Sequence, residues 1–480
     1  MDLFGTAGIR GGVDDRVTPD LALAVGRAVA AEIREPSVET TGGTPASEGT
    51  PEVVVARDGR VTGPAIAAAM EAGLSSGGVR VRRAGQLPTP GLAYASRGRY
   101  GVALTASHNP PADNGIKLFR DGTEFGDDLE AAVEERVADD PEPMPWDEWT
   151  GSTRIDPLDG YLDAVVAYAE DFGADLDGLR VAVDCGNGMA APATPTVLRE
   201  LGATVVTLNG NVDGHFPGRG SKPTPETLRD LRAFVADANE GVDEPGRGGD
   251  GFAFGIGHDG DADRIVVIDA DGEVVHEDTV LAVLAEAYTR RSDAADPVVV
   301  TTPNASGRID ERVTAAGGRV ERVRLGALHE GIAAVRAEAD DGGTDVAFAA
   351  EPWKHVHVPF GGWIDGVCSA AVIARLVAAE GLGALRDPVT ERPYRKVSID
   401  CPDDRKEAAM ARLETALQEA FPDASVDTDH GVRLGFPDAS WTLVRPSGTE
   451  AYVRVYAESD AVDDLVATVR SVVEAAIADA

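Results

Sequence analysis

The chain has 480 residues, of which 82 are Asp or Glu and 44 are Lys or Arg, giving a formal net charge of -38 at pH 7. A surface this anionic repels polyanions, which excludes a role in binding nucleic acid or an anionic membrane surface. The hydrophobic fraction of 43% is enough for several cores in a chain of this length. The acidic residues are spread along the chain, a pattern that indicates adaptation to high salt, as in halophilic archaea.

The three cysteines, Cys185, Cys368 and Cys401, are far apart and show no CxxC spacing. Their arrangement argues against a disulfide framework or a zinc site. No run approaches the ~18 apolar residues that a membrane-spanning helix needs, and the first residues contain no apolar signal core. We therefore expect a cytoplasmic protein in a reducing compartment.

The first part of the chain alternates helical and extended patterns, which predicts an open α/β sheet flanked by helices. The pattern over residues 18–33 is helical, with Thr18 as N-cap and Pro19 at the first helical position. Other predicted elements are strands at 53–56 and 79–82 and a helix at 63–74. Two segments lack either pattern: residues 35–52 are expected to be a flexible insertion, and residues 139–145 a Pro-rich linker.

A polar segment, residues 105–110 (Thr-Ala-Ser-His-Asn-Pro), follows the apolar run 100–104. It presents the hydroxyl of Ser107 on a tight loop after a predicted strand, where a serine can serve as a covalent phosphate carrier. The structural alternative is that Asn109 caps a helix with Pro110 at its first position. Taken alone, this segment leaves both interpretations open.

The middle of the chain repeats the alternating plan. Its predicted elements are a helix from 158, strand 179–184, helix 195–201, strand 204–208, helix 278–289, strand 298–301, helix 308–316 and strand 319–322. Residues 186–188 (Gly-Asn-Gly) are a weak dinucleotide-binding signal, because a third glycine and a ribose-binding acid are missing. We interpret them as a structural turn, and residues 237–251 as a loose Gly/Asp-rich tract.

Residues 259–264 (Asp-Gly-Asp-Ala-Asp-Arg) precede another apolar run. Alternate side chains of an extended segment share one side, so the carboxylates of Asp259, Asp261 and Asp263 are expected to converge. Oxygen ligands of this kind suit Mg²⁺ or another hard cation. An acidic turn without a metal is the alternative in a chain so rich in Asp.

A calcium EF-hand loop is excluded at this segment. That loop needs Gly at its sixth position and Glu at its twelfth, where the chain has Arg264 and Ala270.

The last part of the chain, from about residue 394, is predicted to run strand, helix, strands, helix. Within it, residues 445–450 (Arg-Pro-Ser-Gly-Thr-Glu) precede an alternating strand. Hydroxyls, backbone N–H groups around a glycine, and the guanidiniums of Arg445 and Arg454 make a phosphate cradle. An ordinary hairpin turn is the alternative.

Together with residues 4–11 (Phe-Gly-Thr-Ala-Gly-Ile-Arg-Gly), these three motifs resemble those of the α-D-phosphohexomutase family. The family contains phosphoglucomutases, phosphomannomutases and phosphoglucosamine mutases. The motifs occur in the family's order and approximate spacing over essentially the whole chain. The resemblance implies an α/β fold with four domains, three similar α/β domains and a smaller C-terminal α+β domain, around a central cleft.

We expect the domain boundaries to divide the chain into four segments, which carry in turn the phosphoserine, metal, sugar-binding and phosphate-binding loops. The segments are 1–149, 150–272, 273–385 and 386–480.

The resemblance implies that Ser107 is phosphorylated in the resting enzyme and that a phosphoserine oxygen joins Asp259, Asp261 and Asp263 around Mg²⁺. Phosphate would move between O1 and O6 of a hexose phosphate through a bound sugar 1,6-bisphosphate that turns end for end. Phosphoryl transfer passes through a loose transition state with charge on the equatorial oxygens. Catalysis therefore depends on positioning and charge neutralisation.

The resemblance also assigns catalytic roles to Arg10, His108, Lys117 and Arg264 near the transferred phosphoryl group. Lys117 stands where the family keeps its proposed general acid/base. An isolated lysine titrates near ~10.4, so a lysine base needs a positively charged, partly dry site that lowers its pKa. A solvated surface lysine is the alternative, although the chain has few lysines.

Substrate binding is implied at two further loops. The expected residues are Glu351, Lys354, Arg445, Ser447, Gly448, Thr449 and Arg454. The family typically has Glu followed by a small residue and Gly-His, whereas this chain has Glu-Pro-Trp-Lys-His from Glu351. Trp353 would stack on a sugar face or fill the hexose space, and Lys354 would hold the distal phosphate. His329 is interpreted as a surface-helix residue.

These features predict a phosphohexomutase for glucose or mannose phosphate that requires Mg²⁺ and is primed by a sugar 1,6-bisphosphate. A phosphoglucosamine mutase is the alternative substrate assignment. A sugar-phosphate-binding protein that has lost turnover, or a phosphatase in which water intercepts the phosphoserine, are alternatives of other classes. The expected partner is a small sugar phosphate, with no nucleic acid or membrane, and the chain is expected to be a monomer or homodimer.

The charge pattern generates a prediction about salt. The Debye length falls from about 10 Å at 0.1 M to about 3 Å at 1 M ionic strength, which weakens repulsion within the acidic surface and between it and an anionic substrate. We expect the protein to lose helical circular dichroism or activity on transfer to dilute buffer. Full stability and turnover at low salt would show that the acidic surface has another cause.

Overall fold

The computed structural model describes residues 3–5, 8–37, 50–246, 248, 250–339, 343–447 and 451–480. Its contacts divide the chain into two compact units. Unit 1 comprises Met1–Glu277 and Trp353–Leu385, and unit 2 comprises Asp278–Pro352 and Arg386–Ala480. Most of the expected insertion at 35–52 lies outside the described residues.

The first sheet of unit 1 has the order β1-β5-β4-β2-β3-β7, with β6 paired to β5. Strands β4, β2, β3 and β7 are parallel, whereas β1 and β5 run antiparallel to their neighbours. The strands are β1 (Ile9–Gly12), β2 (Glu52–Arg57), β3 (Arg80–Gln86), β4 (Tyr100–Leu104), β5 (Asp113–Arg120), β6 (Thr123–Glu124) and β7 (Ser152–Arg154).

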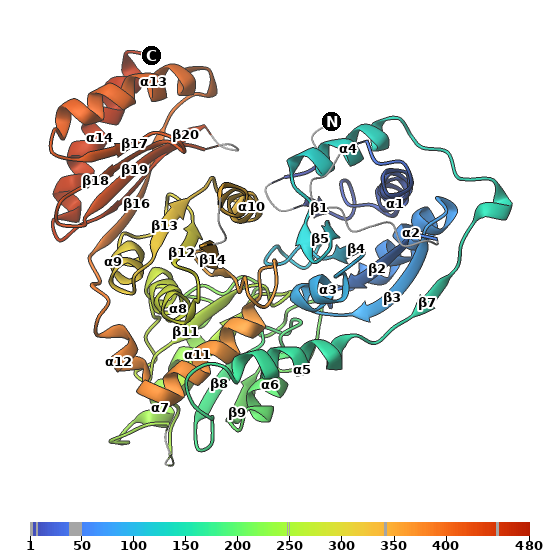
Figure 1. Cartoon of the computed structure of the whole chain (residues 1–480), viewed down its shortest axis with the longest axis horizontal. Helices are drawn as coiled ribbons and strands as arrows, with labels where there is room; N and C mark the ends of the chain where they lie inside the picture. The colour runs from blue at the N-terminus through green and yellow to red at the C-terminus, as the bar shows by residue number, and fades with distance from the viewer. Residues whose placement is uncertain are drawn as a thin grey trace. The chain divides into compact units, whose positions relative to one another are not determined.

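Helices cover both faces of this sheet (Figure 1). They are α1 (Pro19–Arg34), α2 (Gly63–Ser76) and α4 (Asp127–Ala138) on one face and α3 (Thr89–Ala95) on the other, and the 3₁₀ turn η1 (Trp146–Glu148) and α5 (Leu158–Ala169) follow along the chain. Alternate residues of β2 point to opposite faces. Val53 and Val55 join the core under α1, α2 and α4, whereas Val54 and Ala56 pack with residues of α3.

The second sheet of unit 1 has the order β11-β10-β8-β9, in which only the β10–β11 pair is antiparallel. Its strands are β8 (Arg180–Asp184), β9 (Thr204–Leu208), β10 (Phe254–His258) and β11 (Ile265–Ile268). The other elements of this part are α6 (Thr194–Glu200), α7 (Arg229–Asn239), β15 (Lys354–Val356) and α11 (Gly366–Glu380), and α12 (Leu382–Arg386) follows at the boundary of the two units. Leu231 and Val235 of α7 pack on the sheet against Ala182.

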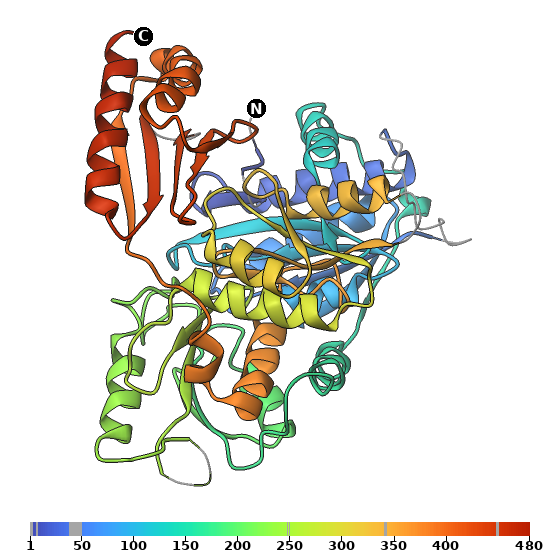
Figure 2. The ribbon, with the colours of Figure 1, turned by 60° about the vertical axis from the view of Figure 1, so that its left-hand side comes forward.

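Unit 2 contains a parallel group, β13-β12-β14, and an antiparallel sheet of order β16-β20-β19-β18-β17. The parallel group comprises β12 (Asp296–Thr301), β13 (Arg319–Arg322) and β14 (Thr344–Glu351), with α8 (Glu277–Arg291), α9 (Arg308–Ala315) and α10 (Leu328–Glu338). The antiparallel sheet comprises β16 (Tyr394–Asp400), β17 (Ser425–Asp427), β18 (Val432–Gly435), β19 (Trp441–Pro446) and β20 (Tyr452–Glu458). Helices α13 (Asp403–Ala420) and α14 (Val462–Ala478) cover one face of it (Figure 2).

The mixed α/β class is confirmed, as are most of the predicted elements. Thr18 caps α1 by accepting a hydrogen bond from Leu21 N, and Pro19 is the first helical residue. One prediction is wrong: the tract 237–251 begins inside α7, which continues to Asn239. The three cysteines are buried and free.

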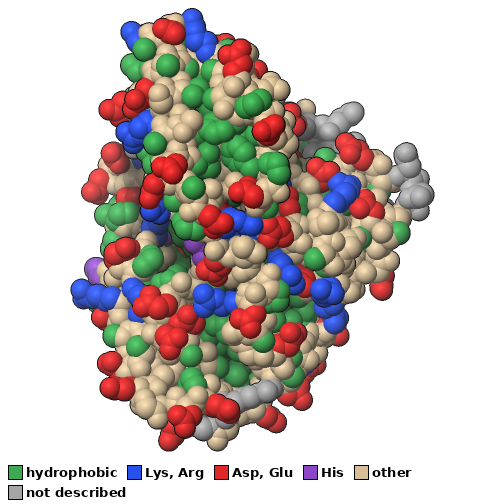
Figure 3. All heavy atoms as spheres, turned by 90° about the vertical axis from the view of Figure 1, so that its left-hand side faces the viewer, with side chains coloured by type: hydrophobic (Ala, Val, Ile, Leu, Met, Phe, Trp, Pro, Cys, Tyr) green, Lys and Arg blue, Asp and Glu red, His purple; other side chains and the backbone are tan. Residues whose placement is uncertain are grey.

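Acidic side chains are scattered over the face seen in Figure 3, with basic side chains interspersed. In the described part of the chain, no helix combines the length and apolar character needed to cross a bilayer.

Candidate active site

Residues 105–112, which contain Ser107 and are called the serine loop below, connect β4 to the antiparallel strand β5. Ser107 is buried and has a left-handed backbone, with φ of 52°. Its Oγ donates a hydrogen bond of 2.7 Å to Asp259 Oδ2, and its N–H donates to Thr105 Oγ1 at 2.9 Å. No helix begins at Asn109, so the capping alternative is wrong. The loop instead brings a hydroxyl from the first sheet to an acid of the second.

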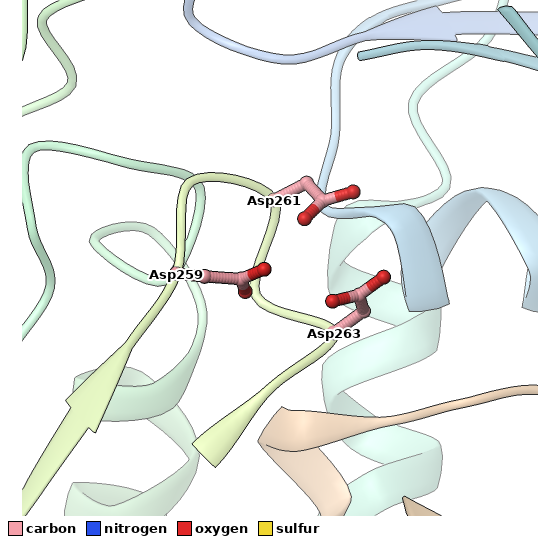
Figure 4. Close-up of side chains that lie close together, drawn as sticks. All are labelled: Asp259, Asp261 and Asp263. Carbon is pink, nitrogen blue, oxygen red and sulfur yellow. The ribbon is translucent and has the colours of Figure 1, made fainter. Parts of the chain in front are cut away.

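The three acids lie in the short connection between β10 and β11, and their carboxyl groups converge (Figure 4). One carboxylate oxygen from each of Asp259, Asp261 and Asp263 lies within 4.8 Å of the other two. The expected convergence is present, but the expected extended segment is not. The chain makes a turn here, in which Ala262 has a φ of 63°.

Gly260 allows the two loops to touch. A Cβ on this residue would lie 2.5 Å from Ser107 O, closer than side-chain carbons approach oxygen atoms. The motif therefore needs glycine between its first two acids for a steric reason.

The acidic cluster fits a divalent cation. All three residues are at least 97% buried, and Asp261 Oδ1 and Asp263 Oδ1 have no hydrogen-bond partner among the described residues. Burial, together with the charges of Asp263 and Asp261, raises the pKa of Asp259 well above its usual value. Buried oxygens that lack partners and repel one another are what a hard cation such as Mg²⁺ stabilises.

Lys117 lies on β5 beside these acids and is buried, so the surface-lysine alternative is wrong. Its Nζ is 3.0 Å from Asp263 Oδ2, 3.6 Å from Asp261 Oδ2 and 3.5 Å from Glu124 Oε1. Burial by itself lowers the pKa of Lys117, but the charges of Asp263 and Asp261 outweigh burial and raise it. The neighbouring carboxylates therefore shift the pKa of Lys117 in the direction opposite to the one that a lysine base needs.

A pocket of about 320 Å³ adjoins the serine loop. Its lining residues are Gly5, Gly8, Arg10, Arg16, His108, Arg264 and Lys354. Burial, reinforced by the charges of Arg264 and Arg10, lowers the pKa of His108 to about 3. At neutral pH the pocket thus contains four cationic side chains and a neutral imidazole, a combination that suits a phosphate group.

Lys354 belongs to this pocket and to the neighbourhood of the serine. Its backbone pairs with Arg264 in an antiparallel bridge. Residues paired in this way project their side chains to the same face, so Lys354 lies beside Arg264. Lys354 thus lines the pocket that adjoins the serine loop, and the expectation that it holds the distal phosphate stays a prediction.

Trp353, the residue before it, packs against the hydrophobic cluster that contains Leu228, Val266 and Ile268. Its backbone has a φ of 71°, and its carbonyl oxygen accepts a hydrogen bond from Ile265 N at 3.3 Å. The indole thus packs against a hydrophobic core of unit 1. This position differs from the two expected ones, stacking on a sugar face and filling the hexose space.

Glu351 is the last residue of β14 in unit 2. Its Oε1 accepts a hydrogen bond of 2.6 Å from Gly326 N. His329 lies in the first turn of α10, as expected for a helix residue.

Two arginines mark the expected phosphate cradle in unit 2. Arg445 on β19 pairs with Arg454 on β20, so the two guanidiniums are cross-strand neighbours. Arg454 also hydrogen-bonds the hydroxyl of Tyr452, and Lys406 Nζ donates to Ser447 O at 2.7 Å. The strands flank a hairpin connection, and Gly448 and Thr449 lie outside the described residues.

Sequence analysis missed several residues that shape the site. Thr89 donates a hydrogen bond of 2.7 Å to Asp261 Oδ2, and Arg16 lines the pocket. Asp58 and Arg60 form a buried ion pair that contacts the serine loop. The only signal for the last two was a polar Arg-Asp-Gly-Arg segment directly after a predicted strand.

Comparison with known proteins identifies relatives over almost the entire chain. Family models described as phosphoglucomutase/phosphomannomutase match residues 1–144 (alpha/beta/alpha domain I), 159–272 (alpha/beta/alpha domain II) and 397–476 (C-terminal domain). A protein of Thermococcus kodakarensis named phosphopentomutase is 38% identical, and the alignment covers 96% of this chain and 94% of the relative. A probable phosphoglucosamine mutase of Methanopyrus kandleri is also 38% identical, covering 95% and 94%. The crystal structure of a phosphoglucomutase/phosphomannomutase family protein from Burkholderia thailandensis matches with a TM-score of 0.80 and 25% identity, covering 99% of this chain and 97% of that chain.

The pocket generates a prediction about Lys354. Replacing Lys354 with Ala removes one of four cations, and the affinity of the unphosphorylated protein for inorganic phosphate should fall about tenfold, the effect of losing one charged hydrogen bond. The exposed Arg229 is the control, because Arg229→Ala changes the net charge equally, away from the pocket. Titration calorimetry at one fixed salt concentration measures the phosphate affinity of both variants. Equal affinities for the two variants would remove Lys354 from the anion site.

Proposed function

Because the chain belongs to the α-D-phosphohexomutase family, we propose that it moves a phosphate between two hydroxyl oxygens of a sugar phosphate, with Ser107 as the temporary carrier. The observation that carries this proposal is the 2.7 Å hydrogen bond from Ser107 Oγ to Asp259 Oδ2. It places a nucleophile within one hydrogen bond of a cluster that suits a divalent cation. A protein that only binds sugar phosphates has no need of that arrangement.

The transfer breaks one P–O bond and forms another. In the resting protein the phosphoryl group is on Ser107, and a sugar hydroxyl attacks it. The new O–P bond forms on the sugar as the bond to Ser107 Oγ breaks, and the proton that the sugar hydroxyl loses is balanced by the proton that Ser107 Oγ regains. The other phosphate of the resulting sugar 1,6-bisphosphate then returns to Ser107.

The cationic pocket would hold the phosphoryl oxygens during this exchange. Arg10, Arg264 and Lys354 neutralise the charge that builds on the equatorial oxygens. Asp259, Asp261 and Asp263 would hold Mg²⁺, which supplies Lewis-acid stabilisation of the same charge.

Lys117 enters this scheme as an acid. Its raised pKa keeps it protonated, so it can supply a proton to an oxygen from which the phosphate departs. To act as a base in the reverse direction, it would first have to give up the proton that Asp263 and Asp261 stabilise.

The substrate is proposed to be a hexose phosphate, with glucose and mannose phosphates as first choice. A second candidate, glucosamine phosphate, is favoured by the name of the Methanopyrus kandleri relative, and the name of the Thermococcus kodakarensis relative adds pentose phosphates to the compounds that need testing. A small phosphosugar is the proposed partner in each case.

Removal of the carrier tests the mechanism. Ser107→Ala should abolish mutase turnover while sugar phosphate still binds, because the pocket cations remain. Ser152→Ala, on the first sheet at β7, is the control and should keep wild-type turnover. Turnover within about tenfold of wild type in Ser107→Ala would contradict the covalent route. Release of inorganic phosphate instead of isomer by the wild-type protein would identify a phosphatase.

A substrate panel tests the sugar. We expect the highest kcat/KM for glucose or mannose phosphate in a comparison with glucosamine and pentose phosphates. Glu351→Ala should mainly raise KM or change the order of preference, because its carboxylate would accept hydrogen bonds from sugar hydroxyls. A higher kcat/KM for glucosamine phosphate would establish the second candidate, and an unchanged KM and preference in Glu351→Ala would remove this residue from sugar recognition.

A further inference from the structure

A buried ion pair directly after β2 supports the serine loop. Arg60 Nε lies 2.9 Å from Asp58 Oδ2, and Arg60 N donates to Asp58 Oδ1 at 2.9 Å. The two side chains are 0% and 1% exposed. Strand β2 is the parallel neighbour of β4, so the residues that follow both strands lie at the same edge of the sheet.

The remaining donors of Arg60 contact the backbone of the serine loop. Nη2 donates to Ser107 O at 3.0 Å and to Asn109 O at 2.8 Å. Nη1 donates to Pro110 O at 2.5 Å and to Asp113 O at 2.8 Å. One planar guanidinium thus binds four carbonyl groups between Ser107 and the start of β5.

The Asp58 carboxylate of the same pair is linked to the backbone on the other side of Ser107. Thr105 Oγ1 donates to Asp58 Oδ2 at 2.8 Å, and Ser107 N donates to Thr105 Oγ1 at 2.9 Å. The peptide groups before and after Ser107 are therefore both linked to the Asp58–Arg60 pair. These contacts stabilise the left-handed φ of 52°, which a non-glycine residue adopts only where its surroundings compensate the strain.

The connection between β9 and α7 also contacts this network. The Phe216 ring lies 5.2 Å from the Arg60 guanidinium carbon, and Ser221 Oγ donates to Asn109 O at 2.8 Å. Arg60 therefore contacts both the serine loop and the connection that follows β9.

We propose that Arg60 is a positioning residue for phosphoryl transfer, which fixes the loop backbone so that Ser107 Oγ stays beside Asp259. This inference rests on the proposed function. Arg60 does not line the cationic pocket, and within the described part of the chain its side chain hydrogen-bonds Asp58 and the loop carbonyls. A lysine keeps the charge but cannot bind four carbonyls with a rigid fork.

The first experiment compares Arg60→Lys with Arg375→Lys in the full chain. Arg375 is also a buried arginine of unit 1 that binds two carbonyls, Phe172 O and Glu170 O, and it lies outside the site. A shift of about 1 Å in a reacting group costs up to about a hundredfold in rate. In Arg60→Lys we therefore expect kcat to fall about tenfold to a hundredfold with KM within about twofold of wild type, and in Arg375→Lys we expect kcat to stay unchanged.

A second pair of variants tests the other side of the network and serves if Arg60→Lys does not fold. Thr105→Val keeps the side-chain volume but removes the hydroxyl between Asp58 and Ser107, whereas Thr105→Ser keeps the hydroxyl. We expect Thr105→Val to lose about tenfold in kcat at near-constant KM, and Thr105→Ser to restore most of it. Thermal unfolding of each variant gives the folded fraction to which kcat is normalised.

Wild-type kcat in the folded Arg60→Lys or Thr105→Val variants overturns the inference. A loss of kcat in Arg375→Lys as large as that in Arg60→Lys also overturns it, because the effect then reports general damage to the fold. Ser107→Ala separates this outcome from failure of the proposed function. If Ser107→Ala has no turnover and Arg60→Lys keeps wild-type kcat, only the positioning role of Arg60 is contradicted. If Ser107→Ala keeps turnover, the proposed function itself is contradicted.

Discussion

Mutual repulsion among three buried carboxylates is the constraint on which this site depends. Asp259, Asp261 and Asp263 approach to within 4.8 Å with almost no access to water, where like charges repel strongly. Positive charge must offset this repulsion, and Lys117 and Arg264 supply part of it. Two carboxylate oxygens lack a hydrogen-bond partner among the described residues, and a divalent cation bound there would supply the rest.

The fold meets this constraint by bringing together segments that follow different strands. The serine loop follows β4, the Asp58–Arg60 pair follows the neighbouring parallel strand β2, and the acids follow β10 of the second sheet. Antiparallel β5 then returns Lys117 to the same edge. The backbone on both sides of Ser107 is consequently linked to the buried Asp58–Arg60 pair, and cationic side chains line the pocket beside it.

Local signals in the sequence predicted the parts of this arrangement that local chemistry determines. The Thr18 cap, the strand before the serine loop and the convergence of the three acids were all recognisable from neighbouring residues. The turn at Ala262 was not, because alternation of acids is equally compatible with a strand. The positions of Arg60 and Lys354 depend on contacts between segments far apart in the chain, and no local pattern encodes them. The direction of the pKa shift of Lys117 could not be predicted for the same reason, since it depends on carboxylates more than 100 residues away in the chain.

Intact-mass analysis of freshly purified protein tests the carrier role of Ser107 most directly. A resting phosphoenzyme should contain a population about 80 Da heavier than the sequence mass, the mass of one added HPO₃ group. Peptide mapping should assign the addition to Ser107, and Ser107→Ala should lack it. An unmodified mass that persists after incubation with a sugar 1,6-bisphosphate and Mg²⁺, or a phosphate mapped to another residue, would contradict the role assigned to this serine.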